Sequence, residues 1–206
     1  MGTDIHGIFQ RHDGEKFVDV ESRYQGDRHY QLFAVLAGVR NGRGFAGFST
    51  GQAIQPIADP RGLPTDFLFD GDCHSTHNGK CLGPYWEEGE PLELWMGDHS
   101  YSWLTSQEML EWYAKAPVVL KLGVITRSYY EMWDRLTTPA FYCAMTAGPG
   151  VLVVEESEVH TTIKPWTHVR VSWKQDLKEE LAYFFEEVQR LHDLYGNVRF
   201  IFGFDS

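Results

Sequence analysis

The chain has 206 residues, of which 43% are hydrophobic, enough for the core of one domain. Its net charge of −11 argues against extended binding of nucleic-acid phosphates, which requires many Lys and Arg side chains. No apolar run is long enough for a membrane helix, the N-terminus lacks the apolar core of a signal peptide, and three cysteines are too few for a disulfide framework, so we expect a cytoplasmic protein.

The N-terminal segment predicts a β-hairpin followed by a short helix. Residues 3–10 alternate in polarity, as in a strand, and an Asp-Gly turn predicts that residues 16–24 return beside them. Asp27 and Gly38 would then bound a helix, as its N-cap and its C-terminal stop.

A long stretch rich in Gly and Pro follows, at about residues 40–91. We interpret it as a loop-rich insertion within a single domain that covers residues 1–206. Loops of this length in a domain are commonly functional.

The C-terminal half has clearer patterns. Thr105 and Glu108 form a capping box that opens a helix ending before Pro117, and residues 118–125 read as a strand. Thr126 or Ser128 could cap a short helix after this strand.

The last third predicts a strand, a helix and a strand. Residues 168–174 alternate, Asp176 caps a helix whose apolar positions recur with helical period up to Tyr195, and residues 198–205 form the final strand. Together with the N-terminal hairpin, this pattern predicts an α+β fold with a mixed β-sheet and packed helices.

Two polar side chains share a face at the start of the first predicted strand. Asp4 and His6 are two residues apart, so both project from the same side. One interpretation is a polar edge that faces solvent. The other is half of a metal or acid–base site, which needs partners from another segment.

The segment MGDHSYSW offers such partners. Asp98 and His99 are adjacent, and in a loop both can point inward. Ser100 and Ser102 place hydroxyl groups close to a potential base. Trp103 is a candidate for stacking on an aromatic ligand, although most aromatic residues of the chain are expected to be core.

Arg61 lies between two prolines and beside a glycine, so its backbone is stiff and approachable. A guanidinium held in this way suits bidentate capture of a phosphate or a carboxylate. The alternative is that Arg61 pairs with Asp59 or Asp66 and only locks the loop.

The segment CHSTHNGKC contains Cys73, His74, His77 and Cys81 within nine residues. These side chains could form a tetrahedral structural zinc site. Their spacing fits no common zinc motif, however, and Asn-Gly-Lys is typical of a plain turn. We therefore expect a surface loop here, with zinc as the alternative.

Several catalytic motifs are missing from the sequence. There is no dinucleotide-binding glycine fingerprint, no phosphate-binding P-loop and no Gly-x-Ser-x-Gly nucleophile elbow. Cys143 lies in an apolar run and is expected in the core.

Five segments, in order, resemble a known family: MGTDIHG, HYQLFAVLAGVRN, PIADPRGLPTD, DHSYSWLT and VRFIFGFDS. They are similar to small phage and prophage proteins that begin Met-Gly-x-Asp-Ile-His. The resemblance covers nearly the whole chain, but CHSTHNGKC is not part of that pattern. It implies a protein of the infected host's cytoplasm, and it implies that one pocket gathers Asp4, His6, Arg61, His99 and Asp205.

These observations lead to a first hypothesis, a metal-assisted hydrolase of a nucleotide or small phosphoester that counteracts host immune signalling. Asp4, His6 and His99 would hold a divalent ion (Mn²⁺, Mg²⁺ or Zn²⁺) that activates water. A strand-borne Asp-x-His also begins the metallophosphoesterase signature, but the rest of that signature is missing. The roles assigned are catalysis for His6, His99 and Asp98, and substrate binding for Arg61, Ser100, Ser102 and Trp103.

Two other hypotheses use the same sequence features. In one, the pocket binds a nucleotide without chemistry and acts as a sponge. In the other, the acidic protein inhibits a host nuclease or defence complex by surface contact. The expected partner is thus a small nucleotide or a host defence protein, with no membrane and no extended nucleic acid; self-association into a homo-oligomer is left open.

Overall fold

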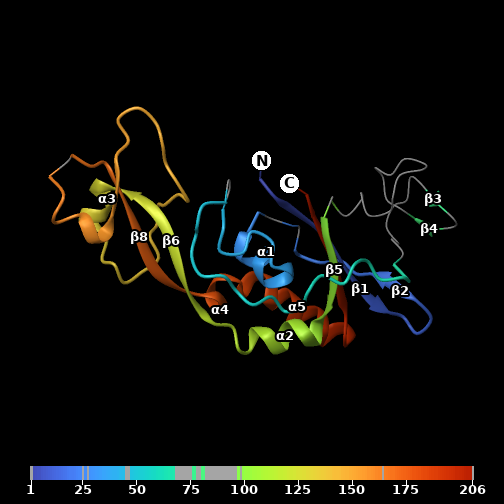
Figure 1. Cartoon of the computed structure of the whole chain (residues 1–206). Helices are drawn as coiled ribbons and strands as arrows, with labels where there is room; N and C mark the ends of the chain where they lie inside the picture. The colour runs from blue at the N-terminus through green and yellow to red at the C-terminus, as the bar shows by residue number, and fades with distance from the viewer. Residues whose placement is uncertain are drawn as a thin grey trace.

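The computed structural model contains two larger β-sheets with helices beside them (Figure 1). The structure describes residues 2–24, 26, 28–44, 47–67, 76–77, 80–81, 97, 99–163 and 165–205. The strands are β1 (Asp4–His12), β2 (Phe17–Asp19), β3 (Thr76–His77), β4 (Lys80–Cys81), β5 (His99–Thr105), β6 (Val118–Thr126), β7 (Val153–Glu155), β8 (His168–Asp176) and β9 (Arg199–Asp205). The helices are α1 (Tyr30–Ala37), α2 (Ser106–Tyr113), α3 (Arg127–Met132), α4 (Leu177–Glu180), α5 (Ala182–Tyr195) and the 3₁₀ turn η3 (Glu156–Glu158).

The four-stranded sheet has the order β2-β1-β9-β5, and all its neighbours are antiparallel. Its strand β9 pairs with β1 from Asp4–Asp205 onward, which brings the two ends of the chain side by side (Figure 1). On its other edge β9 pairs with β5, whose register shifts by one residue between His99 and Ser102. This shift is a β-bulge, and it decides where His99 points.

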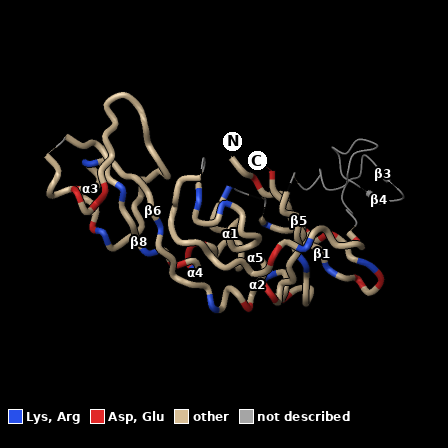
Figure 2. Tube along the Cα trace, in the orientation of Figure 1, with Lys and Arg blue, Asp and Glu red and all other residues tan. Residues whose placement is uncertain are grey.

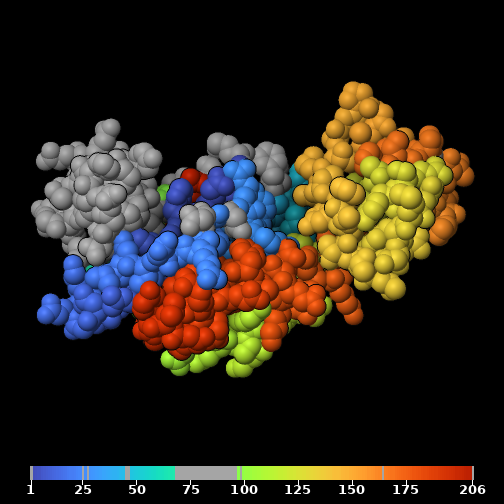
Figure 3. Space-filling view, turned by 180° about the vertical axis from the view of Figure 1, so that it is seen from behind, coloured from blue at the N-terminus to red at the C-terminus, as the bar shows by residue number. Residues whose placement is uncertain are grey.

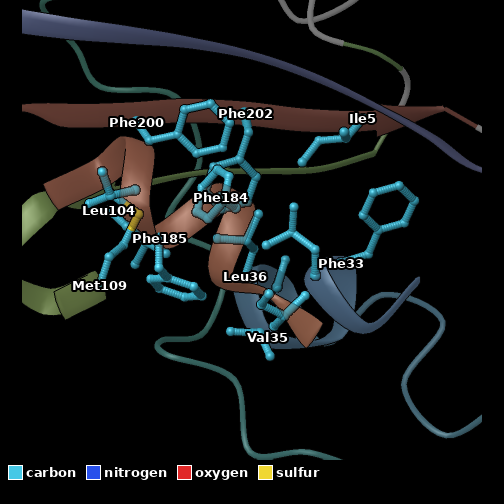
Figure 4. Packing of buried hydrophobic residues seen from close by; sticks show 14 of the residues in the cluster. Ile5, Phe33, Val35, Leu36, Leu104, Met109, Phe184, Phe185, Phe200 and Phe202 are labelled. Atoms are coloured by element: carbon cyan, nitrogen blue, oxygen red, sulfur yellow. The ribbon is translucent and has the colours of Figure 1, made fainter. Parts of the chain in front are cut away.

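One face of this sheet packs against α1, α2 and α5. Phe200, Phe202 and Phe204 of β9 are completely buried there, and their rings contact Phe33 of α1 and Phe184 of α5 (Figure 4). Burial of one such side chain contributes about 1.5–3 kcal/mol. The aromatic layer is therefore the main source of stability in this part of the molecule.

The strand β1 makes room for this layer at Gly7. A Cβ atom at that position would lie 2.3 Å from the ring of Phe200. No real Cβ contact is that short, so any side chain at Gly7 would force the Phe200 ring to move.

Most helix ends follow the predicted caps. Thr105 and Glu108 form the complete capping box of α2, Thr126 caps α3, and Gly38 ends α1 in the left-handed conformation. The N-cap of α1 is His29, two residues later than predicted, whereas Asp27 lies outside the described residues.

Two other boundaries differ from the predictions. The helix expected behind Asp176 is divided at Leu181 into α4 and α5. The strand expected over residues 16–24 is limited to β2, because the backbone pairing with β1 ends at Asp19.

The three-stranded sheet is mixed, with the order β6-β8-β7. The strands β6 and β8 are antiparallel over nine residue pairs, and β7 runs parallel to β8. Together with α3 and η3 this sheet stands away from the helices that cover β9 (Figures 1 and 3). We call it the arm (residues 118–176) and call the four-stranded sheet with α1, α2, α4 and α5 the body. The α+β prediction with a mixed sheet is thus confirmed.

The predicted insertion is described only in part. Residues 40–44 and 47–67 run mostly as loops. The side chain of Asn41 holds them by bonding both the N–H and the C=O of Ile54, each at 2.6 Å. Phe67 anchors the far end in the body, where it is 1% exposed.

The prediction that Cys143 is a core residue is wrong. Its side chain is exposed on the arm, because Cys143 meets β6 through an isolated backbone bridge to Val124 rather than through a buried strand. Within the described part of the chain, no helix is long and apolar enough to cross a bilayer.

Candidate functional site

The face of the body sheet that points away from α1, α2 and α5 carries Asp4, His6 and Trp103 of the predicted site residues; we call it the outer face. Successive residues of a strand alternate between the two faces, so the register assigns each side chain. The outer face includes Asp4, His6, Ile8 and Gln10 of β1 and Arg199, Ile201 and Asp205 of β9.

At the end of this face, four side chains form what we call the terminal cluster: Arg28, Asp4, Asp205 and His6. Arg28 donates to both carboxylate oxygens of Asp4, at 2.7 and 2.6 Å. The backbone N–H of Asp4 donates to Asp205 Oδ1 at 3.1 Å, and Asp205 Oδ2 lies 3.0 Å from His6 Nε2. The hydrogen bond from Arg28 lowers the pKa of Asp4, so this carboxylate is already neutralised by a cation.

The His6–Asp205 pair is the part of the terminal cluster that is suited to acid–base chemistry. Both side chains are a little under half exposed, at 44% and 45%, so a ligand in solvent could reach them. A carboxylate on one ring nitrogen orients an imidazole and selects its tautomer. The pair can thus act in proton transfer.

His99 does not join Asp4 and His6. It pairs with Phe204, its ring stacks on that of Phe204 with centroids 6.0 Å apart, and Phe204 points toward α1. The structure therefore places His99 on the helix-covered face and Asp4 on the outer face. The cause is the bulge in β5, since one extra residue exchanges the faces of the side chains that precede it.

His99 is therefore not available to complete a metal site with Asp4 and His6. Among the side chains that the structure describes, no group of three or more His, Cys, Asp and Glu residues is arranged to hold a metal ion. Asp98, which was assigned a catalytic role, lies outside the described residues. The zinc prediction for Cys73, His74, His77 and Cys81 falls on side chains outside them as well.

Arg61 lies farther along the body, beside α2. Its Nη1 and Nη2 atoms donate to Glu108 at 3.2 and 2.5 Å, and its guanidinium lies 5.2 Å from the ring centre of Trp103. The pKa of Glu108 falls to about 2, chiefly because of this hydrogen bond. The partner of Arg61 is thus neither Asp59 nor Asp66, and both sequence alternatives for the pairing are corrected.

The expectation that Arg61 belongs with Asp4 and His6 is also not met. Trp103 pairs with Ile201, which is four residues from Asp205 along β9. At about 3.4 Å per residue, Trp103, over which the Arg61 guanidinium lies, is separated from Asp205 by roughly 14 Å along the strands.

The predicted substrate-binding serines have structural contacts instead. Ser102 is 1% exposed, and its Oγ accepts the backbone N–H of Arg61 at 3.1 Å. Ser100 takes a positive φ of 55° at the bulge, and its Oγ lies 2.9 Å from His99 Nδ1. Both hydroxyls therefore make hydrogen bonds within the protein, to Arg61 and to His99.

A second arginine, Arg199, was not singled out from the sequence. Its side chain is 5% exposed, and its Nη1 donates to Asp66 at 2.7 Å. The Nε and Nη2 atoms donate to Gln10 Oε1 at 3.1 and 2.8 Å, and the guanidinium stacks on the ring of Phe17 at 3.4 Å. The sequence signal for this residue was an arginine at the start of the strongly apolar final strand, because a buried cation requires hydrogen-bond acceptors and a counter-charge around it.

Arg61 and Arg199 line the same pocket, whose volume is ≈ 560 Å³, within the range of small-molecule sites. We call it the arginine pocket. Its other lining residues include Phe17, Trp103, Asp66, Thr65 and Thr105.

Each arginine of this pocket already has a carboxylate partner. Glu108 is held by Arg61 and by the capping box, whereas the side chain of Asp66 is 57% exposed. Asp66 is therefore the partner that a ligand could displace most easily.

Comparison of the chain with protein-family models, with curated proteins and with solved structures finds no match. The resemblance to phage proteins stays a prediction, and the function has to be inferred from the chemistry of the site.

Proposed function

We propose that this protein binds a small phosphorylated ligand of the nucleotide class in the arginine pocket. One observation carries the proposal: two guanidinium groups and two aromatic rings line a single pocket of ≈ 560 Å³. Guanidinium groups bind phosphate through paired hydrogen bonds, and aromatic rings stack on bases.

Arg199 is the better phosphate ligand of the two. Its guanidinium is held rigidly by Gln10 and Phe17, so little side-chain entropy is lost on binding. A phosphate that replaces the exposed Asp66 on Nη1 keeps the buried charge paired. This exchange of one anion for another leaves no cation uncompensated.

Trp103 is the better surface for a base. It lies on the outer-face strand β5, is partly exposed, and its ring is oriented by Arg61. Stacking of a base on an aromatic side chain contributes about 1–3 kcal/mol.

A second candidate, hydrolysis of the bound nucleotide, is favoured by the His6–Asp205 pair on the same face. In this version the pair would transfer a proton. Asp4, once released from Arg28, would be a ligand of a divalent ion, and such an ion would supply the activation of water. The ion would need further ligands, for which Asp98 stays a prediction.

Calorimetric titration with mononucleotides, dinucleotides and cyclic nucleotides tests the proposal, because the resemblance to phage proteins suggests signalling nucleotides as ligands. The same mixtures with Mn²⁺, Mg²⁺ or Zn²⁺ are then separated by chromatography. Intact ligand after denaturation supports a binding protein, new product supports the hydrolase, and neither binding nor product contradicts both and leaves the acidic inhibitor.

Arg61→Ala is the informative variant, and Arg127→Ala is its matched control. Arg127 also pairs with a glutamate, Glu131, and also lies over a tryptophan, Trp166, but on the arm. Arg61→Ala removes the guanidinium that orients Trp103 and adds positive charge to the pocket, so it should weaken binding about 10-fold. Arg127→Ala should leave binding unchanged, and equal effects of the two variants would contradict the assignment.

A further inference from the structure

A second pocket, of ≈ 360 Å³, lies where the arm joins the body. Its walls come from the start of α1, the end of β8, the α4–α5 segment and the loop that follows α3. We call it the Glu180 pocket, and its lining residues are His29, Thr138, Gln175, Asp176, Glu179, Glu180 and Tyr183. None of them lines the arginine pocket, so this site is independent of the proposed function.

The central side chain is Glu180. One of its oxygens lies 2.9 Å from His29 Nε2, and the other accepts a hydrogen bond from Gln175 Nε2. The hydrogen bond from His29 is the main cause that lowers the pKa of Glu180, so this carboxylate is ionised at neutral pH.

The second polar side-chain atom of each of these two residues, His29 and Gln175, has no hydrogen-bond partner. His29 Nδ1 and Gln175 Oε1 are both buried and without a partner, and Gln175 as a whole is 5% exposed. In the neutral imidazole whose Nε2–H is directed to Glu180, His29 Nδ1 is an acceptor, as Gln175 Oε1 is. Orphaned buried acceptors are rare and indicate a missing donor.

The charges around the pocket are mostly negative. Asp176, Glu179 and Glu180 line it, and acidic positions are visible on α4 in Figure 2. The opposing charge is Lys121 of β6, which interacts with Glu180 and whose pKa is lowered by burial. The exposed ring of Tyr183, with its centroid 5.8 Å from that of His29, adds an aromatic wall.

We propose that the Glu180 pocket binds a small organic cation that carries a guanidinium or primary ammonium group. Such a group has several N–H donors, so it can satisfy His29 Nδ1 and Gln175 Oε1 together. Its positive charge matches the three carboxylates, and the ring of Tyr183 can contribute a cation–π contact.

Occupation of this pocket would also tie the arm to the body. His29 belongs to the body, whereas Gln175 and Thr138 belong to the arm. A bound cation therefore stabilises the junction, and the melting temperature should rise with its concentration.

Calorimetry and thermal unfolding with four probes at equal ionic strength test this proposal. Butylguanidinium presents a guanidinium, butylammonium a primary ammonium, tetramethylammonium a cation without donors, and N-butylurea donors without charge. Butylguanidinium or butylammonium should bind and raise the melting temperature, and the stronger of the two identifies the group. Equal responses to all four probes, or to none, overturn the proposal.

Variants separate a built site from general attraction to an acidic protein. Gln175→Met preserves volume but removes both the orphaned acceptor and the hydrogen bond to Glu180, and it should weaken binding at least tenfold. Glu179→Gln, at an exposed position, should weaken it up to about fivefold.

Glu186→Gln is the matched control, because Glu186 is an exposed residue of α5 that does not line the pocket. It should leave the affinity unchanged. If Gln175→Met does not fold, Glu179→Gln against Glu186→Gln decides, and equal affinities of these two variants overturn the proposal.

Discussion

The body and the arm bury their apolar residues very differently. In the body, the phenylalanines of β9 are completely covered by three helices. The arm has a small cluster around Trp173 and Val171, and it leaves Leu136 88% and Ile163 fully exposed. Apolar burial is the dominant favourable term in folding. The body should therefore be stable by itself, whereas the stability of the arm should depend on its attachment to the body.

That attachment lies where the antiparallel strands β6 and β8 meet the body. Val119 of β6 and Leu177, directly after β8, belong to the same core cluster as the phenylalanines of β9. The strand pair is therefore anchored at one end and carries its own small cluster at the other. Of the two candidate pockets, the arginine pocket lies on the body and the Glu180 pocket lies at this junction.

The largest expected effect is that of a cavity in the body. Phe202→Ala should lower the free energy of unfolding by about 3–5 kcal/mol, because Phe202 is completely buried between β9 and the helices. Urea denaturation measures this change. Trp133→Ala, at an 8%-exposed position in the arm, should lower the midpoint of the same transition much less.

Hydrogen exchange sharpens this contrast. The backbone amides at the end of the β6–β8 strand pair that lies far from the body, near Thr126 and His168, should exchange faster than those of β9. Trp133→Ala should accelerate exchange only at that end of the arm. Equal protection of both regions would mean that body and arm unfold as one unit, and that the comparison fails.

The next effect concerns helix caps in the two regions. Thr105→Ala removes the hydroxyl that accepts from the Glu108 N–H and donates to the Glu108 carboxylate, and leaves the bond from the residue 105 N–H to Glu108 in place. It should cost about 1–2 kcal/mol in thermal or urea unfolding. Thr126→Ala removes only the cap of the six-residue α3 on the arm. It should lower global stability less, and a larger loss than for Thr105→Ala would show that the arm supports the body.

The smallest effect is the acid response of the Arg61–Glu108 pair. The pKa of Glu108 is lowered from 4.5 to about 2 in the folded state. Its stabilising contribution is thus complete above pH 4.5 and is lost as the pH falls toward 2. The side chain is 34% exposed, so solvent screening limits this contribution to about 1 kcal/mol or less.

Glu108→Gln tests this by flattening the stability profile between pH 4.5 and 2. Glu131→Gln on the arm, which breaks an exposed pair with Arg127, serves as the reference. If both variants keep the wild-type acid profile, Glu108 does not contribute through this ion pair.

The sequence was a good guide wherever structure depends on near neighbours. Thr105 with Glu108, Thr126 and Asp176 were expected as caps, and each accepts the hydrogen bond that defines its role. The reason is that a cap satisfies backbone groups within three residues of itself. The alternation in the final strand likewise predicted the buried face of β9.

The sequence was a poorer guide to the site, as His99 shows. Its distance along the chain from Asp4 says nothing about the one-residue bulge that turns it to the opposite face. The choice of Glu108 over Asp59 or Asp66 as partner of Arg61 also depends on how a loop lies against a distant helix.

By itself, then, the sequence determined most helix caps, the strands β1, β6, β8 and β9 and the α+β class, because propensity, capping and apolar period act over a few residues. Only the tertiary structure decided that Arg61 meets Arg199 in one pocket and that His29 meets Glu180 in another. Those pairs are 138 and 151 positions apart. Their contacts follow from strand register and packing, which no local pattern records.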